Sequence, residues 1–241
     1  MSTAVIPFVE QRWSEYTDAQ HQAWGLLYDK RMRVLRSTGS ELFLSGAEAI
    51  GLNRDHVPDL QEINRRLSRM TGWQAVAVAG FIPAADFFAC LADRRFPTTI
   101  TIRPLSSLDY IPEPDIFHDV FGHVPLHADR VFANFLQRFG EVACRAATEE
   151  QTAWMARLFW FTVEFRLIQE PDGLKVYGSG LISSAADAAN ALSEKCTRMP
   201  FDLDAVINQP FDIDHLQDTL FVASSFGQLF DAVREMERRL G

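Results

Sequence analysis

The sequence predicts a mainly α-helical protein with a few short β-strands, an α+β fold in which helices dominate. Long segments with apolar residues at helical spacing, or with helix boundary signals, occur at residues 17–35, 58–72, 148–168, 183–195 and 225–240. Short β-branched or alternating apolar runs occur at residues 73–80, 98–104 and 174–180. No repeat, low-complexity tract or flexible linker interrupts the 241 residues, so we expect a single domain over residues 1–241.

The predicted helices are recognised by their ends as well as by their apolar faces. The first opens with the capping sequence TDAQ at Thr17, and the second starts near Pro58 and stops at Gly72. The segments SSAADAANALSEK and SFGQLFDAVREMERRL are two further predicted helices. The apolar stripe of the helix at 148–168 consists of Trp154, Leu158, Phe161, Phe165 and Ile168.

The predicted strands are short, and each ends at glycine or proline. Their sequences are WQAVAVAG, TTITIRP and LKVYGSG. The stretch VAGFIPAADFF overlaps the first of them and has, by itself, the pattern of a buried strand followed by a turn.

Composition and charge exclude several classes of protein. Hydrophobic residues make up 47% of the chain and 19 residues are phenylalanine, which argues against disorder. The net charge of −9, with no basic cluster, argues against nucleic acid or an anionic membrane as the main partner. The N-terminus lacks a signal-peptide pattern, and the run LFWFTVEF is too short to span a bilayer. Reduced thiols, and hence a cytoplasmic location, are indicated by three widely spaced cysteines, Cys90, Cys144 and Cys196.

The stretch PDIFHDVFGHVPL places two histidines, His118 and His123, five positions apart in an apolar run. Pro114 suits the first turn of a helix, whereas Gly122 and Pro125 favour its end. In an ideal helix, residues five apart point about 140° from each other, so we expect the helix to end at Gly122 and His123 to turn back toward His118. Two core histidines bonded to backbone carbonyls are the alternative. We expect surface or structural roles for the other histidines, His21, His56, His127 and His215.

A pair of imidazoles that binds a metal needs a third ligand, and Glu164 is the best candidate. It flanks the apolar stripe of the helix at 148–168, where an unpaired carboxylate would be costly to bury. An ion pair with Arg157 or Arg103, or an exposed helix face, is the alternative. Two histidines and one carboxylate leave coordination positions open and suit Fe(II) that activates oxygen, whereas zinc with these ligands would point to hydrolysis.

Several motifs of the chain resemble those of the pterin-dependent aromatic amino acid hydroxylases. These motifs are YIPEPDIFHDVFGHVPL, FWFTVEF, VYGSGLISS and VAGFIPAADF, and they occur in the family's order and approximate spacing. The similarity is closest to the bacterial phenylalanine 4-hydroxylases and runs from about Trp13 to Leu229. The resemblance implies a catalytic domain with its core at about 13–229. It also implies a monomer, without the regulatory domain and tetramerisation helix of animal relatives.

The resemblance implies roles for residues around a metal and an amino acid. The metal ligands would be His118, His123 and Glu164. Arg103 matches the guanidinium that holds the substrate carboxylate, and Asp115 matches the aspartate that orients it. The other residues that match substrate contacts are Ile111, Pro114, Trp160, Gly180 and Ser183. Ser183 also matches a partner of the first iron histidine.

The resemblance also implies a pterin site. Phe87 matches the aromatic residue that stacks on the bicyclic ring. The other residues that match this site are Gly80, Phe81, Ile82, Ala84, Asp119 and Phe159. Asp119 stands where animal enzymes have glutamate, as it does in bacterial relatives.

Four positions depart from the family pattern. Phe159 replaces a tyrosine close to the iron, and Ile111 replaces a threonine of the animal substrate pocket. Asp187 replaces a glutamate that supports Ser183, and Arg166 stands where glycine is usual. These changes surround the pocket and bear on substrate choice and on the ring position that is hydroxylated.

The activity that the resemblance implies is a monooxygenase that uses Fe(II), a tetrahydropterin (tetrahydrobiopterin or a bacterial analogue) and O2. Its substrate would be a free aromatic amino acid, and the reaction phenylalanine to tyrosine. The alternatives within this class are hydroxylation of tryptophan or tyrosine, or hydroxylation at the meta carbon. Trp160 disfavours tryptophan as the substrate, because tryptophan hydroxylases carry phenylalanine at this position. A zinc hydrolase and an inactive binding module are the alternatives from other classes.

Overall fold

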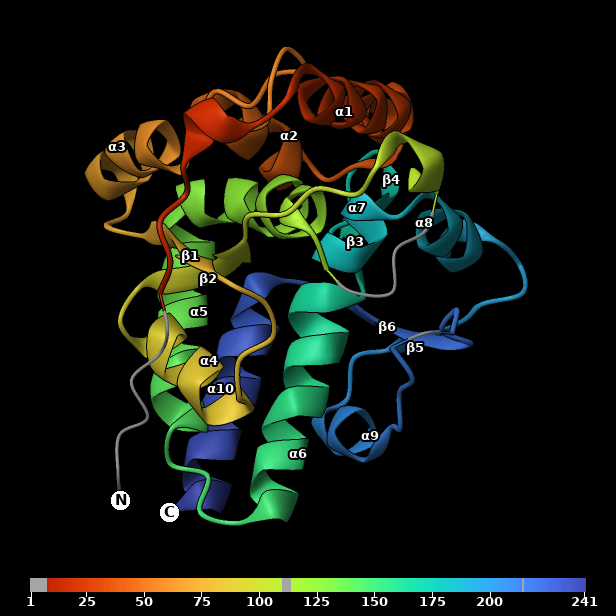
Figure 1. The fold of residues 1–241 in the computed structure, drawn as a ribbon. Helices are drawn as coiled ribbons and strands as arrows, with labels where there is room; N and C mark the ends of the chain where they lie inside the picture. Colours follow the sequence, from red (N-terminus) through yellow and green to blue (C-terminus); the bar gives the residue numbers. More distant parts are fainter. Residues whose placement is uncertain (1–7, 110–113, 214) are drawn as a thin grey trace.

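The computed structural model describes residues 8–109, 114–213 and 215–241, and it confirms the mainly α-helical fold with a few short strands (Figure 1). The described α-helices are α1 (Asp18–Thr38), α2 (Glu41–Ala49), α3 (Leu60–Met70), α4 (Ala84–Ala92), α5 (Arg130–Ala143), α6 (Glu149–Phe159), α7 (Ser179–Ser183), α8 (Ala185–Leu192), α9 (Leu203–Asn208) and α10 (Phe226–Leu240). The short 3-10 or π-helical turns are η1 (Trp13–Glu15), η2 (Leu105–Ser107), η3 (Phe117–His123), η4 (Val124–Ala128) and η5 (Trp160–Glu164). Among the described residues, no helix is long and apolar enough to cross a membrane.

The described strands form two small sheets. In the first, β1 (Gln74–Val78) pairs in parallel with β2 (Arg95–Thr99). The second has the order β4-β3-β6-β5 and consists of β3 (Arg166–Glu170), β4 (Gly173–Val176), β5 (Thr197–Pro200) and β6 (Thr219–Ala223). In this sheet β3 is antiparallel to β4 and parallel to β6, and β5 is parallel to β6. Strands this short carry little sequence pattern of their own.

The helices lie in two groups (Figure 1). Helices α1, α2 and α3 lie together at the top of the view, and α4, α5, α6 and α10 lie together in its lower part. The turn η3 lies between the groups and contacts both α1 and α7. The segment that carries the two histidines is therefore enclosed by elements from both halves of the chain.

Buried aromatic rings fix η3 against the N-terminal helices. Trp24 of α1 meets Phe117 edge to face, with ring centroids 5.3 Å apart, and Phe43 of α2 meets Phe121 at 5.4 Å. Phe117 and Phe121 stack on each other at 4.6 Å, and all four rings are buried. Aromatic pairs of this kind stabilise the fold by more than the burial of their apolar area alone would. The position of η3 therefore depends on α1 and α2.

Most of the predicted helices are confirmed, and their caps explain where they begin. The side chain of Thr17 accepts a hydrogen bond from the Gln20 backbone at the start of α1, and the Gln20 side chain accepts one from the Thr17 backbone. The side chain of Asp59 caps α3 by accepting a hydrogen bond from the backbone N–H of Gln61. Helices α8 and α10 confirm those predicted at 183–195 and 225–240.

The helix predicted at 148–168 is wrong in its last part. Helix α6 continues as the π-helical turn η5, and Phe165 then leaves the helical conformation with φ −122° and ψ 82°. The next residues form β3, which pairs with β4 and β6. Phe165 and Ile168 therefore do not extend the apolar stripe. Strand β4 follows β3 after the turn at residues 171–172, whereas β6 lies far along the chain, where local spacing could not indicate the pairing.

Two of the strand predictions need correction. Only the first two residues of the segment 98–104 belong to a strand, because the N–H of Thr99 donates to the side chain of Asp119 and the loop then turns away. The segment 174–180 is strand only as far as Val176, and its end starts α7. The strand predicted at 73–80 is confirmed as β1, but the sequence AADFF that follows it is part of α4 and not a turn.

Candidate active site

The two histidines lie on the π-helical turn η3, which does not end between them. The predicted helix end at Gly122 is wrong, because Gly122 is not left-handed and the chain runs on through His123 into η4. A π-helix has hydrogen bonds between residues five apart, so such residues lie one above the other on one face. The wider turn, and not a break, brings His118 and His123 together.

Gly122 instead permits a close contact with α7. A Cβ atom at this position would lie 2.8 Å from the carbonyl oxygen of Ser179. Only glycine, which has no Cβ, lets the two backbones approach this closely. The contact matters because α7 carries Gly180 and Ser183.

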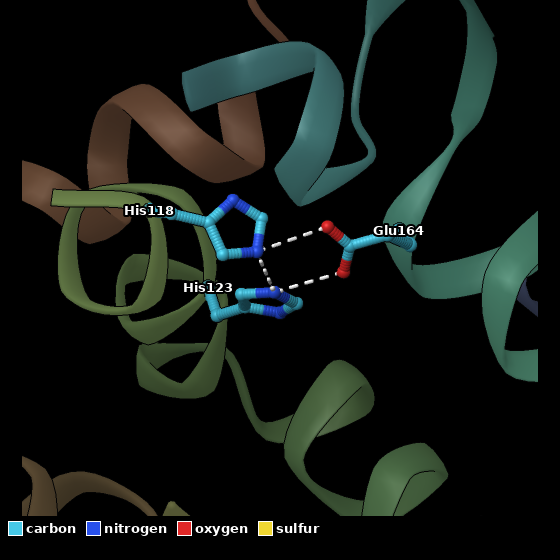
Figure 2. Close-up of side chains that lie close together, drawn as sticks. All are labelled: His118, His123 and Glu164. Carbon is cyan, nitrogen blue, oxygen red and sulfur yellow. Dashed lines mark hydrogen bonds and ion pairs between the residues drawn. The ribbon is translucent and has the colours of Figure 1, made fainter. Parts of the chain in front are cut away.

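Glu164 reaches the histidines from the opposite side, at the end of η5 (Figure 2). Glu164 is only 6% exposed to solvent, so the alternative that it lies on an exposed helix face is wrong. The proposed arginine partners are engaged elsewhere: Arg157 donates to the carbonyl of Ile207, and Arg103 pairs with Asp115. The carboxylate faces both imidazoles instead.

The polar atoms of the three side chains converge (Figure 2). Nε2 of His118 lies 3.1 Å from Oε1 of Glu164, Nε2 of His123 lies 2.9 Å from Oε2, and the two Nε2 atoms are 3.3 Å apart. Ligand atoms held at about 2.1 Å from one divalent ion, and at right angles, are about 3.0 Å apart. The alternative of two histidines bonded to backbone carbonyls is therefore wrong. Two imidazoles and a carboxylate with this spacing fit a ferrous ion that keeps open positions.

Burial and charge act in opposite directions on this cluster. Burial disfavours the charged imidazole of His118, but the Glu164 carboxylate outweighs it and raises the pKa of His118 to about 9. Burial likewise raises the pKa of Glu164, but the two histidines outweigh it and hold that pKa well below its usual range. A carboxylate that stays ionised while buried has a strong tendency to bind a cation, which can replace the protons on the imidazoles.

Ser183 of α7 selects the tautomer of His118. Its Oγ lies 2.9 Å from Nδ1 of His118, and its hydroxyl donates to the carbonyl of Gly180 at 3.4 Å. With the hydroxyl hydrogen directed to Gly180, Oγ accepts from Nδ1–H, and the lone pair of Nε2 points to the metal position. Gly180 is needed here, because a Cβ atom would lie 2.8 Å from the ring of Phe165.

Arg103 and Asp115 form a buried two-pronged ion pair. Nε and Nη2 of Arg103 donate to the two oxygens of Asp115 at 2.8 and 2.9 Å. Asp115 is 0% exposed and also accepts from the backbone N–H groups of Arg103 and His118, both at 3.0 Å. Burial raises the pKa of Asp115, but the bonds from Arg103 outweigh it and lower that pKa. Among residues 8–109, 114–213 and 215–241, Nη1 makes only a long bond, 3.4 Å, to the carbonyl of Leu108, so Arg103 retains donors for a ligand.

A cavity of about 530 Å³ joins the metal-ligand candidates to most of the predicted site residues. This volume is within the range for small-molecule sites. Asp115 stands behind Arg103, and Ile111 lies outside the described residues. The predicted residues in the cavity wall are Gly80, Phe81, Ile82, Ala84, Phe87, Arg103, Pro114, His118, Asp119, His123, Phe159, Trp160, Glu164, Gly180, Ser183 and Asp187.

One wall of the cavity is an aromatic stack. Trp160 is stacked between Phe165 and Phe211, with ring centroids 4.7 and 4.3 Å away. Its indole N–H donates to Gln217, whose own amide donates to two backbone carbonyls of the loop before β6. Phe211 and Gln217 were not predicted as site residues. Their segment carries no local motif, and only the fold places it against η5.

Another part of the cavity wall is lined by the residues predicted for a pterin. Phe87 of α4 meets Phe159 edge to face at 5.2 Å, and the Phe159 ring is nearly parallel to that of His123, at 6.4 Å. Phe81 lies at the rim and is 71% exposed. Phe81 and Phe87 both line the cavity that the metal-ligand candidates share, so this part of the wall offers aromatic faces to a flat heterocycle.

Two acidic residues predicted near the site have different surroundings. Asp119 is buried, and its Oδ2 accepts from the N–H and the hydroxyl of Thr99, both at 2.7 Å. Burial raises the pKa of Asp119. Among the described residues, the Asp187 carboxylate makes no hydrogen bond to Ser183, so it does not support Ser183 directly as the family pattern implied.

The structural role predicted for His127 is confirmed. Its Nδ1–H donates to the carbonyl of His123 at 3.0 Å, and its ring packs between Trp73 and Phe96. Burial lowers the pKa of His127 to about 3, so the ring is neutral. His127 thus supports the backbone of a metal-ligand candidate without facing the metal position.

Comparison with known proteins identifies relatives of the whole described fold. A family model for biopterin-dependent aromatic amino acid hydroxylases matches residues 5–241. The chain is 44% identical to a phenylalanine-4-hydroxylase of Ralstonia nicotianae over 227 residues, which covers 94% of this chain and 72% of that protein. It is 43% identical to the Caulobacter vibrioides enzyme of the same name over 222 residues, 92% of this chain and 76% of the relative.

Solved structures show the same fold. The structure of Chromobacterium violaceum phenylalanine hydroxylase with bound Fe(III) matches with a TM-score of 0.92 and 40% identity, covering 97% of this chain and 86% of that chain. A second structure of that protein, with iron(III) and 7,8-dihydrobiopterin, matches equally well, with a TM-score of 0.92. The chain therefore belongs to the family of biopterin-dependent aromatic amino acid hydroxylases.

Proposed function

We propose that the protein is a phenylalanine 4-monooxygenase that uses Fe(II), a tetrahydropterin and O2 to convert phenylalanine to tyrosine. The observation that carries this proposal is the convergence of His118, His123 and Glu164 in the wall of a cavity that aromatic rings and Arg103 also line. The bacterial relatives named phenylalanine-4-hydroxylase support the choice of substrate. The relative that was crystallised with iron and dihydrobiopterin supports the choice of cofactors.

The residues of the chain bind and orient, while the cofactors supply the oxygen chemistry. When bound, Fe(II) and the tetrahydropterin provide the activation of O2. His118, His123 and Glu164 would hold the metal on one side and leave the side toward the cavity open for the reaction. Phe87 and Phe159 would hold the pterin against the wall nearest His123.

The amino acid would be held at both of its ends. Arg103 binds the substrate carboxylate with the donors that Asp115 leaves free, and Asp115 keeps the guanidinium in one orientation. Trp160 and Pro114 pack against the aromatic ring and keep water away from it. Fixing both ends places one ring carbon toward the metal, which would determine the hydroxylated position.

The direct test supplies Fe(II), a tetrahydropterin and each aromatic amino acid in turn, and identifies the product by mass and chromatographic retention. We expect para-tyrosine from phenylalanine, with oxygen uptake that requires both iron and the pterin. A meta-hydroxylated product would contradict the assigned ring position. Turnover supported by zinc without a pterin would indicate a hydrolase instead, and the absence of metal binding would indicate a binding module.

Replacing Trp160 by phenylalanine should shift the substrate preference toward tryptophan. The smaller ring leaves room between Phe165 and Phe211, where the indole now sits. We expect the ratio of kcat/KM for tryptophan over phenylalanine to rise by about 10-fold. One change of size in an apolar pocket alters the free energy that discriminates two substrates by about 1–3 kcal/mol. Trp154→Phe, on α6 outside the cavity wall, is the matched control. A ratio that is unchanged in both variants would remove Trp160 from the substrate site.

We also infer that the chain works as a single catalytic domain, as a monomer, in the cytoplasm. One continuous apolar core across the described residues supports the single domain. The free cysteines Cys90, Cys144 and Cys196 support a reducing compartment. Light scattering should give a mass near 27.3 kDa, and a larger mass that persists on dilution would contradict the monomer.

A further inference from the structure

Helix α1 contains an arginine whose surroundings its sequence does not suggest. Arg31 lies in the charged stretch YDKRMRV, between the exposed residues Lys30 and Arg33, yet it is only 3% exposed. Its Nε donates to the carbonyl of Ile182 at 2.7 Å, and its Nη2 donates to the carbonyl of Leu181 at 2.9 Å. The guanidinium thus joins α1 to the end of α7, about 150 residues away in the sequence.

The carbonyls that Arg31 binds belong to a helix of five residues. The last carbonyls of any helix lack partners within it. At the end of α7, the N–H of Ser184 donates a hydrogen bond to the carbonyl of Gly180. Among the described residues, Arg31 alone donates to the carbonyls of Leu181 and Ile182. The orientation of the end of α7 therefore depends on the guanidinium of Arg31.

The next residue of α7 contacts a metal-ligand candidate through its side chain. Ser183 follows Ile182 directly, and its Oγ lies 2.9 Å from Nδ1 of His118. The other end of α7 is fixed as well, because Ser179 lies against Gly122 with no room for a Cβ atom. A continuous path of contacts thus runs from Arg31 through α7 and Ser183 to the imidazole of His118.

Arg31 stays charged in this buried position. Burial lowers its pKa to about 10, and the nearby charge of Asp187 acts in the opposite direction. Both residues line the same cavity as the metal-ligand candidates. A charged fork forms stronger hydrogen bonds to carbonyl oxygens than a neutral donor would.

We propose that Arg31 is a positioning residue for the metal site, which holds the end of α7 so that Ser183 keeps the imidazole of His118 aimed at the metal. This inference rests on the proposed function, since it presumes that His118 binds iron. Arg31 touches no ligand in this role. Its effect passes through Ser183, so removing it matters only while Ser183 can bond to His118.

The test measures the affinity of the metal-free protein for Fe(II), by competition with a ferrous chelator, in the wild type and in Arg31→Leu, Ser183→Ala and the double variant. We expect Arg31→Leu to weaken Fe(II) binding by about 10-fold, as is usual when support of a ligand is lost. The double variant should bind no more weakly than Ser183→Ala alone. The electron paramagnetic resonance signal of the ferrous nitric oxide complex should change in Arg31→Leu in the same direction as in Ser183→Ala.

A matched control is available on β5. Arg198 also donates to two carbonyls at a helix end, those of Ala191 and Ser193 at 3.1 and 3.0 Å, but it does so at the far end of α8. Arg198→Leu should lower thermal stability without changing Fe(II) affinity. If Arg31→Leu does not fold, Arg31→Lys, which keeps the charge but not the fork, replaces it in the same cycle.

The possible failures are distinguishable. Wild-type protein that binds no Fe(II) would overturn the proposed function and this inference with it. Wild-type binding together with unchanged affinity in the Arg31 variant would overturn the inference alone. Effects of Arg31→Leu and Ser183→Ala that multiply in the double variant would show that Arg31 does not act through Ser183, and would also overturn it.

Discussion

Replacing Glu164 by alanine is expected to remove iron and activity together while leaving the fold intact. Loss of a group that merely supports a metal ligand costs about 10- to 100-fold in affinity, so loss of the ligand itself should cost more than about 100-fold. His118→Ala should have the same effect, because both side chains contribute to one set of ligand atoms 2.9–3.3 Å apart. Metal analysis after gel filtration and pterin-dependent oxygen uptake measure the two losses.

Two further variants separate a ligand effect from a general one. Glu164→Gln keeps the size of the side chain and removes its charge, so it should fold like the wild type and still lose iron. Glu170→Gln, on β3 and outside the cavity, should keep full iron content. Normal iron in Glu164→Ala or His118→Ala would refute the ligand assignment, whatever the remaining activity.

Replacing Arg103 by alanine should weaken the binding of phenylalanine far more than it changes iron content. A hydrogen bond to a charged group contributes about 1.5–3 kcal/mol of net free energy. If Arg103 contributes this much to the binding of phenylalanine, its loss should raise the KM for phenylalanine by about 10- to 150-fold. The metal ligands lie on other segments and should still bind Fe(II). Steady-state kinetics with saturating pterin, together with metal analysis, give both quantities.

The same substitution leaves Asp115 buried without its partner. Breaking a buried ion pair from one side costs about 3–5 kcal/mol of stability, which by itself could reduce activity. The double variant Arg103→Ala/Asp115→Asn removes the unpaired charge, so it should regain stability but not substrate affinity. Arg95→Ala breaks an exposed arginine–aspartate pair with Asp93 and should change neither. A KM that recovers in the double variant would exclude Arg103 as the carboxylate site.

The chemistry of the metal site was largely predictable from residue types. Two imidazoles in an apolar run and a carboxylate beside an apolar stripe are each costly unless they have partners, and the structure brings all three together. The local path was predicted wrongly, because a helix end at Gly122 and a π-helical turn both bring His118 toward His123. Hydrogen bonds five residues apart have no sequence signature that distinguishes them from ordinary helical ones.

Some structure that the sequence could have revealed was not predicted. Helix α5 begins at the capping residue Asp129 and carries apolar residues at helical spacing, among them Phe132, Leu136 and Phe139. The helix predicted to run through Phe165 failed for another reason. Strand β3 has its backbone partners in β4, which follows after a short turn, and in β6, more than fifty residues further on, and strand preference depends on such a context.

The sequence by itself determined the helical character of the protein and the kinds of side chain available for metal and carboxylate binding, since caps, spacing and functional groups are local properties. Only the tertiary structure decided which of them meet. It placed Glu164 against two histidines about forty residues earlier and brought Ser183 into contact with His118. It also buried Arg31, whose guanidinium donates hydrogen bonds to the end of α7. These contacts join residues that are distant along the chain, and their geometry depends on how whole elements pack around a shared core.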